Sequence, residues 1–142
     1  VNFCPVKRFG LGEENAVRNT MALVLSGGGG ERLSVLTEER AVSALPFGGK
    51  YRVIDFALSN GCHSGFEYVG VITQHAPISL NDHIGAGRPW DLARNVGGVR
   101  IFQPFVARGR PREWYRGTAD AVLSAEAFAG DDVTHGAQTV AV

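Results

Sequence analysis

Two short apolar runs and a stretch of helical spacing between them indicate the first elements of this chain. Residues 21–25 and 68–73 are continuously apolar, which is typical of strands that are covered on both faces. Between them, apolar residues recur at helical spacing over 50–60, with Asn60 and Gly61 as the expected stop. Most of these apolar residues are expected to pack in the core: Val53, Ile54, Phe56 and Leu58. Two buried strands joined by a helix predict a parallel pair with a right-handed crossover.

The second half of the chain continues the same alternation. Residues 79–84 are expected to form a short helix and 99–102 a short strand, with a polar loop between them. A helix is predicted from Thr118, which suits an N-cap, to Gly130. Its apolar stripe consists of Ala121, Val122, Ala125 and Phe128. Residues 139–142 would form the next parallel strand, so the pattern as a whole predicts an α/β fold.

A run of glycines follows the first predicted strand directly. Ser26 precedes four glycines, 27–30, and a cationic residue, Arg32, comes shortly after them. Consecutive glycines after a buried strand let backbone N–H groups approach an anion, although such a run is also typical of a plain flexible turn. The nearby cations Arg32, Lys50 and Arg52 favour phosphate binding. The loop nevertheless lacks the Gly-Lys-Ser/Thr ending of a P-loop and the downstream acidic residue of a dinucleotide fold.

Length and charge exclude several classes of protein. At 142 residues the chain is expected to form one domain, and its net charge of zero argues against a nucleic-acid partner. No apolar run approaches the roughly 18 residues that span a bilayer, so no membrane partner is expected. Cys4 and Cys62 show neither metal spacing nor a disulfide framework, which favours a reduced, cytoplasmic setting. The histidines have no ligand spacing either and are expected to be structural or exposed: His63, His75, His83 and His135.

Several segments match the motifs of one known family. The glycine loop with Arg32 and Leu33 matches, as do FGGKYRVIDFALSN at 47–60, GVITQ at 70–74 and WYRGTADAV at 114–122. On these residues the chain resembles the sugar-1-phosphate nucleotidyltransferases, and more narrowly glucose-1-phosphate adenylyltransferase (ADP-glucose pyrophosphorylase). The resemblance implies a parallel-sheet, Rossmann-like nucleotide-diphospho-sugar transferase domain, of which this chain would be the N-terminal half. Residues 20–142 would belong to that partial domain, and 1–19 would be an N-terminal extension.

The resemblance also implies a reaction. Adenylyl transfer from ATP to α-glucose 1-phosphate would give ADP-glucose and pyrophosphate, the entry step to glycogen. Magnesium would bridge the phosphates, and its aspartate ligand is expected beyond Val142. The chain by itself is therefore expected to be inactive, and full-length members of the family form homo-oligomers.

Particular residues receive roles from the same resemblance. Arg32 would hold the phosphates that leave as pyrophosphate and is the expected catalytic residue, unless it is an ordinary surface arginine. Tyr115 and Trp114 would contact the substrate, or else pack as plain core aromatics, and Arg52 falls where family members bind a regulatory nucleotide. The nucleotide would be held by Ser26, Gly27, Gly28, Gly30, Gln74, Gly117 and Thr118. Gln74 could instead simply cap a strand end.

Three positions depart from the family pattern. The family arginine inside the loop is Gly29 here, a family lysine that contacts phosphate is Val42, and Ser43 takes the place of the following proline. The activator-contacting lysine of some members lines up with Glu39. Loss of one preorganised charge-stabilising group costs about 10² to 10³ in rate. The alternative hypothesis is therefore a catalytically degenerate, nucleotide-sensing regulatory subunit or paralogue.

Overall fold

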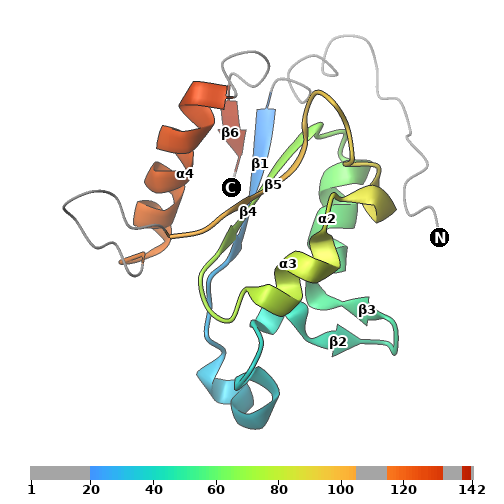
Figure 1. Cartoon of the computed structure of the whole chain (residues 1–142), viewed down its shortest axis with the longest axis vertical. Helices are drawn as coiled ribbons and strands as arrows, with labels where there is room; N and C mark the ends of the chain where they lie inside the picture. The colour runs from blue at the N-terminus through green and yellow to red at the C-terminus, as the bar shows by residue number, and fades with distance from the viewer. Residues whose placement is uncertain (1–19, 105–114, 133–138, 142) are drawn as a thin grey trace.

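A computed structural model describes residues 20–104, 115–132 and 139–141. At its centre lies a four-stranded sheet with the order β5-β4-β1-β6, in which every neighbouring pair is parallel (Figure 1). The strands are β1 (Thr20–Ser26), β4 (Tyr68–Thr73), β5 (Gly98–Phe102) and β6 (Thr139–Ala141). The α/β class and the expected strands are thereby confirmed. The predicted extension 1–19 and Trp114 lie outside the described residues.

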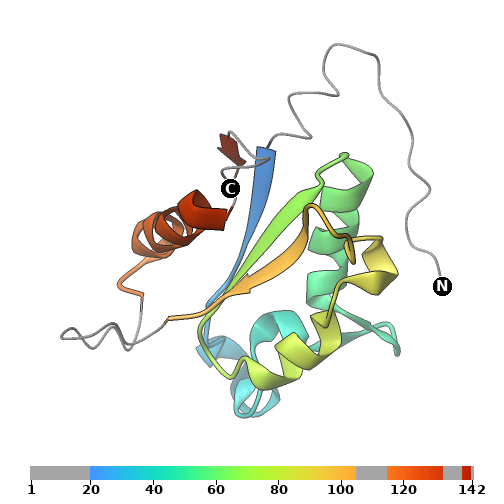
Figure 2. The same cartoon turned by 45° about the horizontal axis from the view of Figure 1, so that its top comes forward.

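Helices cover both faces of the sheet. The helices α2 (Val53–His63) and α3 (Ile78–Ile84) lie on one face, and α4 (Thr118–Asp132) lies on the other (Figures 1 and 2). Each face has its own apolar cluster, because successive side chains of a strand point to opposite sides. The cluster under α2 and α3 consists of Ala41, Ala44, Ile54, Leu58, Val69, Val71, Leu80, Ile84, Trp90 and Leu92. The cluster under α4 consists of Met21, Leu23, Ile72, Ala121 and Ala125.

The start of α2 differs from the helix predicted over 50–60. Tyr51–Arg52 form the short strand β3, which pairs antiparallel with β2 (Pro46–Phe47). The helix begins only at Val53, because the Asp55 carboxylate accepts a hydrogen bond from the Arg52 backbone N–H (2.9 Å) and so satisfies a donor at the helix start.

The end and the outer face of α2 also differ from expectation. The helix continues through Gly61 to His63, where the Ser64 N–H still donates to the Asn60 carbonyl oxygen at 2.9 Å. Val53 and Phe56, expected in the core, are 43% and 49% exposed because neither belongs to the apolar cluster between α2 and the sheet. Phe56 packs edge-on against Phe47 of the hairpin, with 5.3 Å between ring centroids.

Three further expectations need correction. The loop expected to be polar before β5 contains the 3-10 helix η3 (Arg88–Trp90) and buries Trp90 and Leu92 under the sheet. At the start of α4 the Gly117 carbonyl accepts the first helical hydrogen bond, so the cap falls at Gly117 and not at Thr118. The helix also runs past Gly130 to Asp132.

Two expectations remain, one about disulfide bonds and one about membrane-spanning segments. Cys62 is disulfide-bonded, contrary to the expectation of no disulfide framework, and Cys4 lies outside the described residues. Within the described ranges, no helix has both the length and the apolar content needed to cross a membrane.

Candidate functional site

A cavity of about 370 Å³ opens where β1 and β4 end. The two strands are parallel and in register up to Ser26 opposite Thr73, so Gly27 and Gln74 leave the sheet side by side. Ligands of open α/β sheets bind at such carboxyl ends of strands. The lining residues come from three separate segments of the chain: Leu25, Gly27, Gly28, Ile72, Gln74, Tyr115, Gly117, Thr118 and Ala121.

The lining combines an apolar floor with a few polar groups at its rim. Leu25 lies on the same face of β1 as Met21 and Leu23, but it is 38% exposed because that face opens into the cavity. Gln74 and Thr118 supply an amide and a hydroxyl, and Gly28 has no atom within 4 Å of the place where a side chain would begin. Such a pocket fits a flat, partly apolar ring that is oriented by a few hydrogen bonds.

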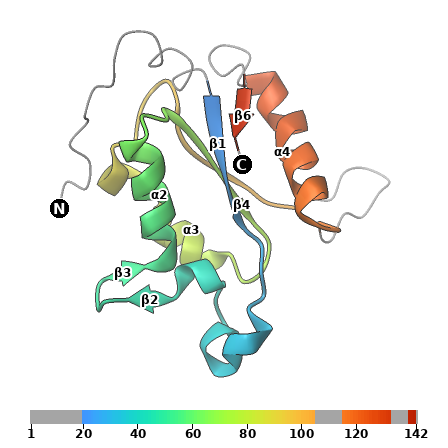
Figure 3. The ribbon, with the colours of Figure 1, turned by 180° about the vertical axis from the view of Figure 1, so that it is seen from behind.

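The glycine loop packs closely against η1 and the residues that follow it. Gly30 has φ of +66°, and a Cβ at this position would clash with the side chains of Val42 and Thr37. The Thr37 hydroxyl, at the end of the 3-10 helix η1 (Glu31–Thr37), donates to the Gly30 carbonyl oxygen at 2.9 Å. Figure 3 shows how β1 runs through this loop into η1 at one end of the sheet. Gly30 is therefore required by the turn itself and does not line the cavity.

Ser26 also lies beneath the loop. It is buried, and its hydroxyl oxygen lies 2.5 Å from that of Ser43, in the 3-10 helix η2 (Val42–Ala44). This contact joins the end of β1 to η2, and Ser26 does not line the cavity. Gly27, Gly28, Gln74, Gly117 and Thr118 do line it, so the structure brings together five of the seven residues predicted to hold a nucleotide. Their binding roles stay predictions.

The other predicted residues are distributed differently. Tyr115 lines the cavity next to Gly117, as a substrate contact would require. Arg32 is exposed on η1 and lines neither this cavity nor the second one described below. The same holds for Lys50, which lies in the β2–β3 turn with its ammonium nitrogen 5.6 Å from the centre of the Tyr51 ring.

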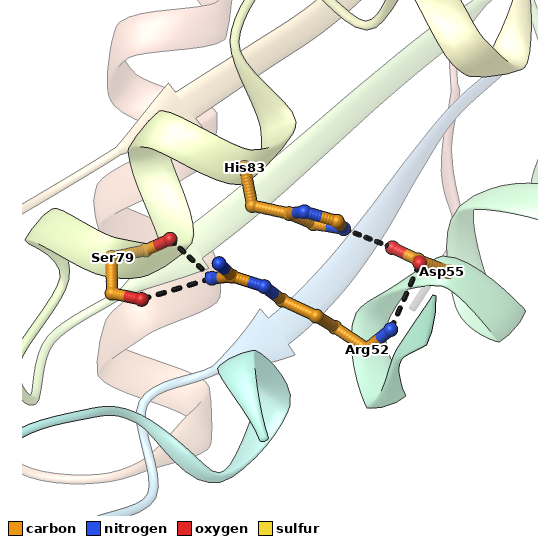
Figure 4. A network of polar contacts seen from close by, with 4 residues as sticks. All are labelled: Arg52, Asp55, Ser79 and His83. Carbon is orange, nitrogen blue, oxygen red and sulfur yellow. Dashed lines mark hydrogen bonds and ion pairs between the residues drawn. The ribbon is translucent and has the colours of Figure 1, made fainter. Parts of the chain in front are cut away.

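Arg52 belongs to a polar network that joins α2 to α3 (Figure 4). Its Nη1 donates to the carbonyl oxygen of Ser79 at 2.5 Å and to the Ser79 hydroxyl at 2.9 Å. His83 Nε2 lies 2.5 Å from Asp55 Oδ1, and the His83 ring packs edge-on against Trp90. The guanidinium predicted to bind a regulatory nucleotide thus already bonds to α3, and the regulatory role stays a prediction.

A second cavity, of about 460 Å³, lies on the η1 side of the glycine loop. It is lined by Glu31, Ser34, Val35, Thr37, Glu38 and His75. The ring of His75 lies 3.9 Å from the place of a Cβ on Gly29, so it stands directly beside the loop. Spacing rules for metal ligands did not single out His75; its position immediately after Gln74, at the end of a strand, is the signal that could have done so.

The expected magnesium finds no ligand set in this part of the chain. Among the described residues, no group of three or more histidine, cysteine, aspartate or glutamate side chains could hold a metal ion. We therefore derive no chemical step through a metal, and the magnesium requirement stays a prediction.

The chain is similar to known proteins in sequence and in fold. The sequence profile described as "Nucleotidyl transferase" matches residues 21–141. A protein of Thermotoga maritima named glucose-1-phosphate adenylyltransferase is 59% identical over 104 residues, which are 73% of this chain and 24% of that protein. Proteins of the same name from Thermomicrobium roseum (61% over 101 residues, 70% and 23%) and Bacillus licheniformis (53% over 108 residues, 76% and 28%) match similarly. The chain thus spans about a quarter of the length of these relatives.

Among solved structures, UDP-glucose pyrophosphorylase complexed with UDP-glucose has a similar fold. The TM-score is 0.57 at 17% identity, over 80% of this chain and 42% of that one. At this identity the likeness concerns the fold alone.

Proposed function

The chain belongs to the nucleotidyl transferase family, and from this premise we propose that it supplies the nucleotide-binding part of a glucose-1-phosphate adenylyltransferase. The proposed reaction transfers the adenylyl group of ATP to α-glucose 1-phosphate and gives ADP-glucose and pyrophosphate. The name of the relatives from Thermotoga, Thermomicrobium and Bacillus supports this choice of nucleotide and sugar.

The observation that carries the proposal is the meeting of three distant segments around one cavity. The glycine loop after β1, Gln74 after β4 and the Tyr115–Thr118 turn before α4 are far apart in sequence and line the same space. In the proposed complex, the adenine ring lies on the apolar floor and the Gln74 amide and Thr118 hydroxyl orient it. The backbone of Gly27 and Gly28 then lies along the nucleotide, where no side chain keeps it away.

The proposed chemistry requires positioning more than covalent participation. An anionic phosphate oxygen of glucose 1-phosphate attacks the α-phosphorus of ATP in line with the leaving group. A new oxygen–phosphorus bond forms while the bond from the α-phosphorus to the bridging oxygen breaks, and pyrophosphate leaves with the electron pair. The attacking oxygen carries no proton at neutral pH, so no general base is needed. The protein contributes orientation and neutralisation of charge, and Arg32 is the proposed contact for the leaving pyrophosphate.

Calorimetry with ATP tests the proposal on the 142-residue chain. We expect ATP to bind, and Arg32→Ala to weaken binding about tenfold, as loss of one charge-assisted hydrogen bond would. Arg88→Ala is the matched control, since Arg88 is exposed like Arg32 but lies in η3, whereas Arg32 directly follows the glycine loop in η1; the affinity of this variant for ATP should stay within twofold of wild type. Absence of ATP binding by a chain whose circular dichroism shows the α/β fold would overturn the proposal. We also expect the chain alone to form no ADP-glucose in a chromatographic assay.

A second function, nucleotide sensing without catalysis, is favoured by one observation. Val42 places its apolar side chain against Gly30, and Gly29 has no side chain, so neither position offers a cation beside the loop. Glycine and valine can be placed at the aligned positions of the Thermotoga maritima relative. A loss of about 10² to 10³ in its turnover for each substitution would support the sensing role. Unchanged turnover would leave adenylyl transfer as the better proposal.

A further inference from the structure

His75 lies beside the glycine loop. Its neighbour Gln74 lines the first cavity, and His75 itself lines the second. The ring atoms Cγ, Nδ1 and Cδ2 all lie 3.9–4.0 Å from the place of a Cβ on Gly29. A group that extends from the first cavity along Gly28 to Gly29 would therefore lie beside the imidazole ring.

Among the described residues that line these two cavities, only His75 can carry a positive charge. The cations Arg32, Lys50 and Arg52 line neither cavity, and the loop itself offers only backbone N–H groups. Moreover, the His75 side chain has no hydrogen bond or ion pair with another residue of the described segments, so both ring nitrogens remain available to a ligand. A nucleotide's phosphates on the glycine loop would therefore lie beside a side chain that can carry a positive charge.

We propose that His75, in its protonated form, binds a phosphate oxygen of the nucleotide whose base occupies the first cavity. This inference rests on the proposed function, because it takes ATP as the occupant of that cavity. The phosphate chain then runs across Gly28 and Gly29, and the imidazolium donates a charge-assisted hydrogen bond to it. Because a histidine ordinarily changes charge between about pH 5 and 8, the affinity for ATP falls as the pH rises through this interval.

The other charged groups around His75 do not produce the same pH dependence. Glu31, in η1, and Glu38, directly after it, line the second cavity, and both are exposed, so water and salt screen their repulsion of phosphate. The phosphates of ATP titrate in this interval, and this contribution cancels when wild type and variant are compared at the same pH.

The test measures the dissociation constants of ATP and adenosine at pH 6 and pH 8 for wild type, His75→Gln and His63→Gln. His63 is the matched control, since it is exposed at the far end of α2, where its Nδ1 lies 2.7 Å from the Ser59 carbonyl oxygen. We expect His75→Gln to bind ATP about tenfold more weakly than wild type at pH 6 and within twofold at pH 8. Adenosine affinity should be equal in all three proteins, because adenosine has no phosphate.

A second readout requires no variant. In the wild-type protein at pH 6, the ring signals of His75 in NMR spectra should shift with ATP and not with adenosine, while those of His63 stay in place. Equal ATP affinity of wild type and His75→Gln at pH 6 would overturn this inference and leave the proposed function intact. An equal loss for ATP and adenosine would also overturn it, because His75 would then be structural. If neither ligand binds the wild type, the proposed function fails first and this inference with it.

Discussion

Among the described residues, polar side chains are paired in one region of the molecule and unpaired in another. The first region is the junction between α2 and α3, and the second, called the sheet edge here, is the end of β1 and β4 beside the glycine loop. At the junction, Arg52 and Asp55 each have a partner within the chain. At the sheet edge, the side chains of Gln74, His75 and Thr118 hydrogen-bond no other residue in the described part of the chain. Paired polar groups stabilise a fold, whereas polar groups that converge on a cavity without partners are free to bind a ligand.

The sheet edge is nonetheless rigid beneath its surface. The hydroxyl contact between Ser26 and Ser43 and the bond from Thr37 to Gly30 fix the loop from below. The difference between the two regions therefore lies in where the hydrogen bonds are made. At the junction, the hydrogen bonds join the two helices. At the sheet edge, they lie on the side of the glycine loop away from the cavity, so the side that faces the cavity is preorganised for a ligand.

The largest expected effect comes from the packing under the loop. Gly30→Ala should lower the free energy of unfolding by about 2–4 kcal/mol, because it combines a positive φ with a clash against Val42 and Thr37. Urea unfolding measures the loss of stability. Gly28→Ala is the control, since a Cβ added at Gly28 would have no other atom within 4 Å. In a Val42→Ala background the cost of Gly30→Ala should shrink. Equal costs at Gly30 and Gly28 would contradict the described loop.

The next effect tests the junction. Asp55→Ala should cost about 1–3 kcal/mol of stability, because it leaves the Arg52 N–H and the His83 ring without their partner. Asp82→Ala, on the exposed side of α3, should stay within about 0.5 kcal/mol. ATP affinity should be unchanged in both variants. A loss of ATP binding in Asp55→Ala at unchanged stability would show that the junction is itself a ligand site, and the contrast between the regions would not hold.

At the sheet edge, substitutions should weaken ligand binding and leave the stability nearly unchanged, the opposite of what is expected at the junction. Gln74→Ala should weaken ATP and adenosine alike by about three- to tenfold, since one hydrogen bond to the base is lost. Its stability should stay within about 0.5 kcal/mol of wild type. Gln103→Ala is the matched control: it is also a glutamine directly after a strand, but it is exposed and lines neither cavity. Unfolding curves and calorimetry together distinguish a binding role for Gln74 from a structural one.

The smallest expected effect concerns the hydroxyl pair under the loop. Ser26→Ala and Ser43→Ala should each cost about 0.5–1 kcal/mol, because the remaining hydroxyl, half-buried at Ser43 or buried at Ser26, loses its partner. The double variant should cost no more than either single one, and the double-mutant cycle should give a coupling free energy of similar size. Additive costs would mean that the two hydroxyls do not interact.

Local patterns were sufficient for the elements whose signals are short-range. The apolar runs correctly predicted β1 and β4, and the spacing after residue 118 predicted α4. The β2–β3 hairpin was missed because each strand has only two residues, which carry no periodicity. Burial of Trp90 and Leu92 was missed because a polar-looking loop folds back under the sheet, and that is a tertiary event.

For the candidate site, the sequence by itself determined which residues follow the strand ends. The glycines come after β1, Gln74 and His75 come after β4, and Thr118 opens α4. Only the tertiary structure decided which of them share a cavity. The register of β1 on β4 places Gly27 beside Gln74, the packing of α4 adds Thr118, and the bonds to Ser79 hold Arg52 at α3. These contacts join residues far apart in the chain, so no local pattern contains them.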